Sequence, residues 1–208
     1  MSKLFVTNIS SHRSADELES LVETVDTSTP IGLRNRAILL SLIDLGLRAS
    51  DVADLELGGV DLAGRVLHLR CRKQRQSACV PMTKRLATAI GVYVRHGRPP
   101  EIPLVQNASA LLFVKHRAPR GASLTSFGIR QVVRRHAEQA GLAHRIRGTH
   151  VIRHSVASRM INAGATMKQI ADLLGHRSLD TTAIYAKVDL VSLTQVALPW
   201  PTSREVTP

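Results

Sequence analysis

Residues 149–188, THVIRHSVASRMINAGATMKQIADLLGHRSLDTTAIYAKV, contain three polar features at fixed spacing. His150 and Arg153 are three residues apart in a predicted first helical turn, so both side chains share one face. His176 follows a Leu-Leu-Gly helix ending, and Tyr185 comes nine residues later. An arginine can bind two oxygens of one phosphate, and an imidazole can donate or accept a proton. A tyrosine beside them is a candidate nucleophile toward that phosphate.

This ordered set resembles the catalytic motif of the tyrosine recombinase (phage integrase) family, which has H-x-x-R, then L-G-H, then a tyrosine about nine residues on. The corresponding segments here are HVIR at 150–153, LLGH at 173–176 and TTAIYAKVD at 181–189. H-x-x-R alone occurs by chance, whereas the complete ordered set is specific. The resemblance implies a mainly α fold with a small antiparallel β-sheet (α+β), of the tyrosine-recombinase catalytic-domain type. It also implies an enzyme that breaks and rejoins DNA strands.

A second motif, GLRASDVADLEL at 46–57, lies in a predicted connection between two helices. Taken alone, Arg48 would be an exposed interhelical arginine. The segment resembles the family pattern T-G-L-R-x-S-E-L, whose arginine is the first catalytic arginine, with Leu45 in place of Thr and Asp51 in place of Glu. The resemblance therefore implies a catalytic Arg48 and an acidic residue that supports the site. Ser50 is predicted to cap the short helix that follows.

Residues 66–81 are predicted to form a β-hairpin, because apolar and polar residues alternate on both sides of a polar turn. The family carries a catalytic lysine on this hairpin, eight residues before the proline of a Val-Pro pair, and that position is Lys73 here. The usual flanking glycines are replaced by Arg72 and Gln74. An alternative is a basic hairpin that only binds phosphates, through Arg72 or Arg75.

The two cysteines, Cys71 and Cys79, could face each other across this hairpin, symmetrically about Arg75. This arrangement is compatible with a disulfide. It is also compatible with two reduced cysteines that pack as small apolar side chains. The N-terminal sequence lacks a secretory signal pattern, so we expect a cytoplasmic protein with reduced thiols.

Helices are predicted at about 15–25, 31–45 (ended by Gly46), 83–96 (opened by Thr83), 126–140, 149–163 (capped by Thr149) and 166–174. By resemblance, six side chains surround the reacting phosphate: Arg48, Lys73, His150, Arg153, His176 and Tyr185. Further arginines on the hairpin, on the basic loop 115–123 and on the outer face of helix 126–140 are candidate DNA contacts: Arg72, Arg75, Arg117, Arg120, Arg130 and Arg134. An ordinary solvated face is the alternative for these six.

The charge is unevenly distributed along the chain. Residues 1–64 hold 5 Lys/Arg and 10 Asp/Glu, whereas residues 65–188 hold 22 Lys/Arg and 4 Asp/Glu. Such a localised excess of positive charge favours a polyanionic partner over a merely solvated surface. The sequence has no long apolar segment of the kind that would indicate a membrane protein. His150, His154 and His176 lack a companion set of Cys or carboxylate ligands, so neither a metal nor a nucleotide cofactor is predicted.

The predicted organisation is an irregular lead-in at 1–13, a catalytic domain at 14–190 and a C-terminal tail at 191–208. The tail either folds back on its own domain or, by resemblance, docks on a neighbouring protomer. The resemblance does not cover the helical N-terminal domain that usually completes the family's clamp around DNA. It implies double-stranded DNA as the partner and self-association into a tetramer on DNA.

Three functions are compatible with these patterns. The first is a recombinase, integrase or transposase of a mobile element that works through a 3′-phosphotyrosine intermediate. The second is a non-catalytic DNA-binding relative or fragment that occupies recombination sites. The third, a type IB topoisomerase, is disfavoured because H-x-x-R is typical of recombinases and the chain is short.

Overall fold

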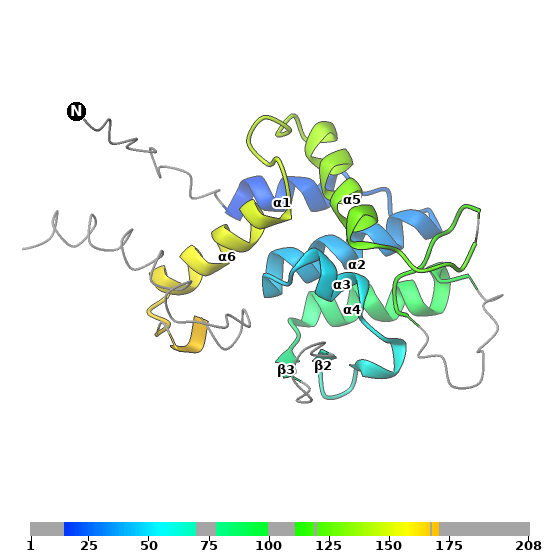
Figure 1. Cartoon of the computed structure of the whole chain (residues 1–208), viewed down its shortest axis with the longest axis horizontal. Helices are drawn as coiled ribbons and strands as arrows, with labels where there is room; N and C mark the ends of the chain where they lie inside the picture. The colour runs from blue at the N-terminus through cyan, green and yellow to red at the C-terminus, as the bar shows by residue number, and fades with distance from the viewer. Residues whose placement is uncertain (1–14, 70–77, 100–110, 119, 167, 171–208) are drawn as a thin grey trace, which may run out of the picture.

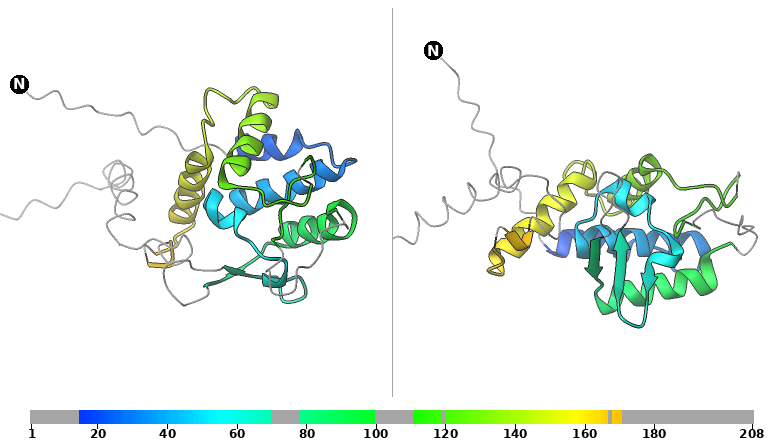
Figure 2. Two further views of the ribbon diagram at one scale, coloured as in Figure 1. Left: turned by 45° about the vertical axis from the view of Figure 1, so that its right-hand side comes forward. Right: turned by 60° about the horizontal axis from the view of Figure 1, so that its bottom comes forward.

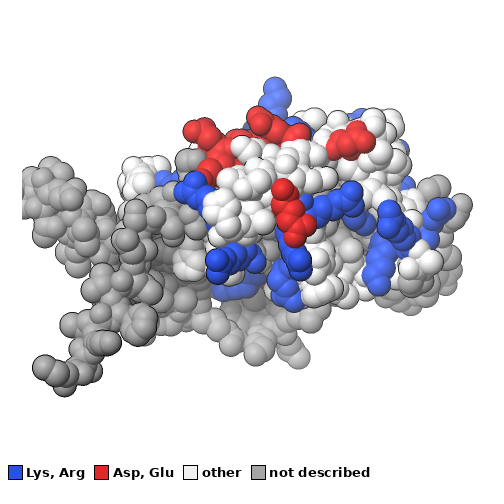
Figure 3. Space-filling model, turned by 90° about the horizontal axis from the view of Figure 1, so that it is seen from above, with Lys and Arg blue, Asp and Glu red and all other residues white. Residues whose placement is uncertain are grey.

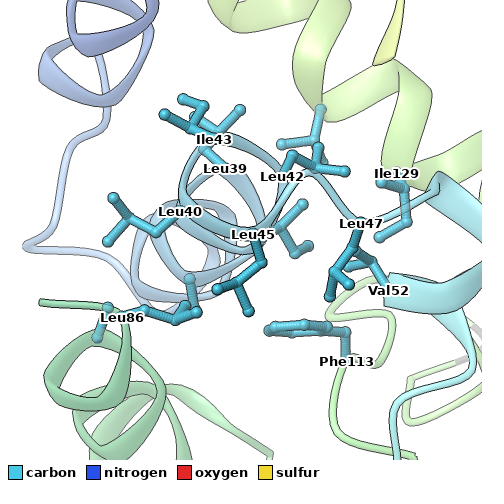
Figure 4. Close-up of a cluster of buried hydrophobic side chains, with 14 of the residues drawn as sticks. Leu39, Leu40, Leu42, Ile43, Leu45, Leu47, Val52, Leu86, Phe113 and Ile129 are labelled. Carbon is cyan, nitrogen blue, oxygen red and sulfur yellow. The ribbon is translucent and has the colours of Figure 1, made fainter. Parts of the chain in front are cut away.

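Helix α2 (Pro30–Leu45) is the central element of the fold, and the other long helices pack around it (Figure 1). The computed structural model describes residues 15–69, 78–99, 111–118, 120–166 and 168–170. The α2 sequence, PIGLRNRAILLSLIDL, has apolar residues on nearly every side, and such a helix is stable only when it is surrounded by protein. The side chains of Leu40 and Leu42 accordingly point to different sides of the helix, and Leu39 and Ile43 point together to another (Figure 4).

Both ends of α2 are fixed by local sequence. The hydroxyl oxygen of Thr29 accepts a hydrogen bond from the backbone N–H of Gly32 at 3.0 Å, and Pro30 occupies the first turn, where its missing N–H is not needed. Gly46 ends the helix in the left-handed conformation, with φ 63°, and its N–H donates to the Leu42 carbonyl. The predicted end of this helix at Gly46 is therefore confirmed.

The helices that pack against α2 are α1 (Ala15–Glu23), α4 (Lys84–Val92), α5 (Ser126–Gln139) and α6 (Thr149–Asn162). A π-helical turn, η2 (Tyr93–Gly97), extends α4, and the short helix α3 (Ala49–Ala53) packs between α2 and α5. Their apolar faces meet in one core, to which α4 contributes Leu86 and α5 contributes Ile129 (Figure 4). Burial of this shared apolar surface is the main force that holds the helices around α2.

A three-stranded antiparallel sheet lies at one edge of the helical layer (Figure 2). It follows a 3₁₀ turn, η1 (Leu57–Gly59), and consists of β1 (Val60–Asp61), β2 (Val66–Leu69) and β3 (Ala78–Pro81) in that order. Leu67 of β2 pairs with Val80 of β3, and both side chains are buried in the core. The predicted fold class, mainly α with a small antiparallel sheet, is confirmed. The tip of the predicted hairpin lies outside the described residues.

The register of the hairpin contradicts the proposed symmetry about Arg75. Cys79 pairs with His68, and its Sγ lies 3.3 Å from the imidazole Nδ1 of that residue. Cys79 is a free cysteine. The pairing of Cys79 with Cys71 was therefore wrong, because the two strands are shifted relative to the alignment that the sequence suggested.

Two predicted helix caps were also wrong. Helix α3 begins directly after Arg48, which has the extended backbone of an N-cap residue, so Ser50 lies inside the helix. Helix α6 begins at Thr149 itself, and Gly148 is its N-cap. No helix in the described ranges combines the length and the apolarity that crossing a bilayer requires.

Candidate functional site

Arg48 stands where the chain turns from α2 into α3. The Asp51 carboxylate accepts a hydrogen bond from the backbone N–H of Arg48 at 3.2 Å, and the Arg48 guanidinium lies 4.0 Å from the same carboxylate oxygen. The Arg48 side chain is nevertheless 46% exposed. Asp51 thus fixes the backbone from which Arg48 extends, while the guanidinium remains accessible to a large ligand.

Arg153, in the second turn of α6, contacts the same turn between α2 and α3, although it is 107 residues away from Gly46 in the sequence. Its Nη1 donates a hydrogen bond to the backbone carbonyl of Gly46 at 2.7 Å. Gly46 precedes Arg48 by two residues, so this bond brings together two motifs that are separated by about half of the sequence. The carbonyl belongs to the C-terminal end of a helix, where backbone oxygens lack helical partners and where a cation is favourable.

Arg159 makes a second contact of this kind, since its Nη2 donates to the carbonyl oxygen of Ile43 in the last turn of α2. Two arginines of α6 therefore satisfy the terminal carbonyls of α2 and fix the position of α6 against it. The role of Arg159 is not predictable from the sequence, because nothing in the local pattern marks an arginine whose partner is a distant backbone carbonyl.

His150 lies one turn before Arg153 and is exposed at the beginning of α6. Helix N-termini attract anions through their free N–H groups and their dipole, and α6 has fourteen residues behind this end. The ring centroid of His150 is 6.5 Å from that of His154, and the two rings are nearly perpendicular. Desolvation is the largest cause that lowers the pKa of His154, and the nearby His150 and Arg153 side chains lower it further. This favours a neutral His154 beside the candidate site.

Three of the six predicted catalytic residues are described, and they are Arg48, His150 and Arg153. Five predicted site residues lie outside the described part of the chain. They are Lys73, His176 and Tyr185 of the catalytic set, and Arg72 and Arg75 of the DNA-contact set. The remaining contact candidates are all exposed: Arg117 and Arg120 on the loop after Val114, and Arg130 and Arg134 on α5.

Two adjoining clefts of about 310 and 440 Å³ lie between the start of α2, the loop after Val114 and α5. Their basic lining residues are Arg34, Lys115, Arg117, Arg120 and Arg135, together with His116 and His136. Burial, followed by the positive charges of Arg34 and Arg120, lowers the pKa of His116 to about 4. The clefts therefore present arginine and lysine charges around an imidazole that is neutral at neutral pH.

A buried polar network lies beside these clefts. The Thr24 hydroxyl donates to the Leu21 carbonyl at 2.8 Å, so it accepts from Nδ1 of His136, also at 2.8 Å. The Nε2 of His136 can then accept from the side-chain amide of Asn35 at 3.3 Å, and the Asn35 carbonyl oxygen accepts from Nε and Nη2 of Arg34. This chain of bonds connects α1, α2 and α5 and requires a neutral His136.

The charges that are separated along the sequence are also separated in space. On the face seen from above, most of the visible Lys and Arg side chains lie in the lower half of the view, and most of the visible Asp and Glu side chains lie in the upper half (Figure 3). In the described ranges, no three His, Cys, Asp or Glu side chains gather so that they could hold a metal ion. The distribution gives one side of the molecule the charge that a polyanion requires.

Comparison with known proteins identifies the class to which this fold and these motifs belong. The model of the phage integrase family matches residues 13–190, and the chain belongs to this family. The chain is 40% identical to integrase/recombinase y4rA of Sinorhizobium fredii over 89% of its own length and 44% of that protein. It is 33% identical to tyrosine recombinase XerC of Pelotomaculum thermopropionicum, over 83% of its own length and 56% of XerC.

The chain thus spans about half the length of these curated relatives. Among solved structures, the XerA recombinase superposes with a TM-score of 0.71 at 25% identity, covering 90% of this chain and 65% of that protein. The fold predicted from the motif resemblance, that of a tyrosine recombinase catalytic domain, is therefore confirmed.

Proposed function

We propose that this protein is a site-specific DNA recombinase or integrase of a mobile element, acting on double-stranded DNA in the cytoplasm. The observation that carries the proposal is the hydrogen bond from Arg153 to Gly46, because it puts the second motif arginine beside the segment that bears Arg48. Two arginines that the fold brings to one turn from distant segments suit the non-bridging oxygens of one phosphodiester. The names of the relatives, integrase/recombinase y4rA and tyrosine recombinase XerC, support the same activity.

In the proposed reaction, the phenol oxygen of Tyr185 attacks the phosphorus in line, and the bond from phosphorus to the 5′-oxygen breaks. His150 accepts the phenol proton as general base, and Lys73 donates a proton to the leaving 5′-oxygen as general acid. The products are a 3′-phosphotyrosine and a free 5′-hydroxyl. These roles come from the family resemblance, since Lys73 and Tyr185 lie outside the described residues.

Arg48 and Arg153 would stabilise the charge that develops on the phosphate in the pentacoordinate transition state, and His176 would donate a further hydrogen bond to it. The phosphotyrosine retains the energy of the broken bond. A 5′-hydroxyl of a second strand can therefore attack it and release the tyrosine without a metal ion or a nucleotide cofactor. Exchange between two DNA duplexes fits a tetramer, with one protomer at each of four strands.

The test uses nicked duplexes with a randomised core, in which cleavage next to the nick releases a short strand and traps the covalent intermediate. We expect the protein with Tyr185 present to form a covalent adduct with DNA that persists when the protein is denatured. The adduct should disappear in Tyr185→Phe and persist in Tyr93→Phe, because Tyr93 is the only other tyrosine and is fully buried in the core.

An adduct that persists in Tyr185→Phe would overturn the proposed nucleophile. DNA binding without any adduct, over the whole library, would instead favour a non-catalytic relative that occupies sites. Sequencing the trapped strands also identifies the preferred DNA site.

A further inference from the structure

A buried arginine near the start of α2 has no acidic partner in the described part of the chain. Arg34 is only 9% exposed. Its Nε and Nη2 donate to the side-chain oxygen of Asn35 at 3.2 and 2.9 Å, and its Nη1 donates to the backbone carbonyl of Val114 at 3.0 Å. All of these acceptors are neutral. Because a buried charge is normally balanced by an opposite one, Arg34 lacks a counter-ion.

The smaller of the two adjoining clefts gives an anion access to Arg34. Arg34 lines this cleft together with Lys115, Arg117 and Arg135, and none of these three side chains forms an ion pair with a carboxylate in the described ranges. The adjoining cleft is lined by Arg117 and Arg135 as well, and Asp26 is its only acidic lining residue. The clefts therefore carry an excess of positive charge that a small polyanion would neutralise.

Two of the cations act on the same point inside the clefts. His116 lines both clefts, and after burial the positive charges of Arg34 and Arg120 are the causes that lower the pKa of its imidazole. Arg34 belongs to α2, whereas Arg120 belongs to the loop after Val114. An anion bound beside His116 would therefore be attracted by guanidinium groups from two separate elements.

The clefts lie far from the segment that carries Arg48. Arg34 is in the second turn of α2, and Arg48 follows the last turn, so at least eleven helical residues, or about 17 Å, separate them along the helix. A phosphate of duplex DNA belongs to a continuous backbone, which cannot enter a cleft to reach a buried guanidinium. The terminal phosphate of a small molecule can, and the clefts have the volumes of small-ligand pockets, about 300–1,000 Å³.

The smaller cleft also has an apolar lining. Ile31, Leu124 and Val132 line it beside the cations. A ligand that matches both parts of the lining has several negative charges at one end and a flat, weakly polar group at the other. Nucleotides have this combination, because a chain of phosphates is joined through a sugar to an aromatic base.

We propose that the two adjoining clefts bind a nucleoside diphosphate or triphosphate, whose phosphates contact Arg34 and the cations around it and whose base packs on the apolar lining. The nucleotide is a ligand at a second site and not a reactant in strand exchange, since the clefts are remote from Arg48. The inference does not depend on the proposed strand cleavage.

The experiment is a calorimetric titration of the full chain without DNA, with ADP as the ligand and adenosine as the uncharged comparison, at about 0.15 M salt. We expect one saturable ADP site and at least tenfold weaker binding of adenosine. Lys115→Gln and Arg135→Gln should each weaken ADP binding about tenfold, the effect of losing one charge-assisted hydrogen bond. Neither residue belongs to the predicted catalytic or DNA-contact sets.

Lys84→Gln is the matched control, because Lys84 is exposed at the start of α4 and lines neither cleft. This variant should bind ADP as the parent chain does. Asn35→Asp is the second test, since it puts a carboxylate of nearly the same shape beside Arg34. The added carboxylate should supply the missing charge and weaken ADP binding more than tenfold, and urea unfolding verifies that the variant folds.

The proposal is overturned if ADP does not saturate one site, if Lys84→Gln weakens binding as much as Lys115→Gln, or if Asn35→Asp binds ADP as tightly as the parent chain. Competitive displacement of ADP by a short DNA duplex would also overturn it, because the clefts would then hold phosphates of DNA. Adduct formation with the nicked duplex, measured without nucleotide, reports separately on strand cleavage.

Discussion

The guanidinium Nη1 of Arg153 donates a hydrogen bond to the backbone carbonyl of Gly46 at 2.7 Å, and this contact connects α6 to the turn that carries Arg48. One donor of the guanidinium is thereby used to hold the fold. An arginine has five N–H donors in a rigid plane, so this bond restricts the orientation of the whole guanidinium group beside the turn. The same side chain can therefore position the site and act in it.

Arg153→Lys is expected to reduce the rate of DNA adduct formation about 100-fold or more, although the charge is retained. A lysine ammonium cannot reach the Gly46 carbonyl and bind two phosphate oxygens in one plane. Loss of one preorganised donor to a developing anion typically has an effect of this size. The measurement is the single-turnover rate with the nicked duplex at saturating protein.

Arg159→Lys is the control for this prediction, because Arg159 makes a similar bond from α6 to the Ile43 carbonyl of α2. Both variants should unfold at somewhat lower urea concentration than the parent chain. Equal losses of rate in the two variants would show that Arg153 acts only through the packing of α6.

Gly148→Ala is expected to slow adduct formation by up to about 10-fold with little change in stability, since a misplacement of about 1 Å can slow a reaction about 100-fold and a smaller one has a smaller effect. A Cβ atom at Gly148 would come within 3.1 Å of Nδ1 of His150, so the exposed imidazole would have to move. Gly58→Ala is the control, because a Cβ there meets no atom within 4 Å. An unchanged rate in Gly148→Ala would show that His150 need not occupy its observed position.

Local sequence was sufficient for most helix boundaries. Gly46 was correctly predicted to end α2, and Thr83 to open α4, where its hydroxyl oxygen accepts from the Leu86 N–H at 3.2 Å. In both cases the signal is a residue whose own backbone or side chain forms the boundary. The predicted cap at Ser50 was wrong because Asp51 already binds the Arg48 backbone, and the chain becomes helical directly after Arg48.

The relative positions of the site residues could be expected only from the motif resemblance. Residue spacing showed that His150 and Arg153 share a face of one helix, but not that Arg153 binds the carbonyl of Gly46, which is far away in the sequence. Contacts between a side chain and a distant backbone carbonyl leave no periodic pattern. The strand register that pairs Cys79 with His68 also depends on packing, through the buried pair of Leu67 and Val80.

The free energy of unfolding is expected to fall as the pH is lowered from about 6.5 toward 4. Burial is the largest cause that lowers the pKa of His116 to about 4, from an ordinary value of 6.5. In this range the unfolded chain binds a proton at this residue and the folded chain does not, so protons favour unfolding. Above about pH 6.5 both states are neutral at His116, and its contribution is constant.

Urea unfolding of the parent chain and of His116→Gln, measured between about pH 7.5 and pH 5, tests this expectation. The glutamine is neutral throughout and can still contact the Tyr93 hydroxyl, which lies 3.4 Å from Nε2 of His116. The stability of the variant should decline less steeply. Parallel curves for the two proteins would mean that His116 does not resist protonation in the folded state.

Asp44→Asn is expected to lower the free energy of unfolding by about 1–3 kcal/mol, the usual effect of breaking a desolvated, charge-assisted set of hydrogen bonds. The Asp44 side chain is only 3% exposed. Its carboxylate accepts hydrogen bonds from the Thr83 hydroxyl at 2.5 Å and from Nε of Arg85 at 3.0 Å. These bonds connect the end of α2 to the start of α4. Glu19→Gln is the control, since the bond of Glu19 to the same Arg85 lies between half-exposed side chains, and such pairs contribute less than about 1 kcal/mol. If urea unfolding gives equal losses for both variants, burial of the Asp44 carboxylate does not strengthen its bonds, and Arg85 joins α2 and α4 no more firmly than a surface ion pair does.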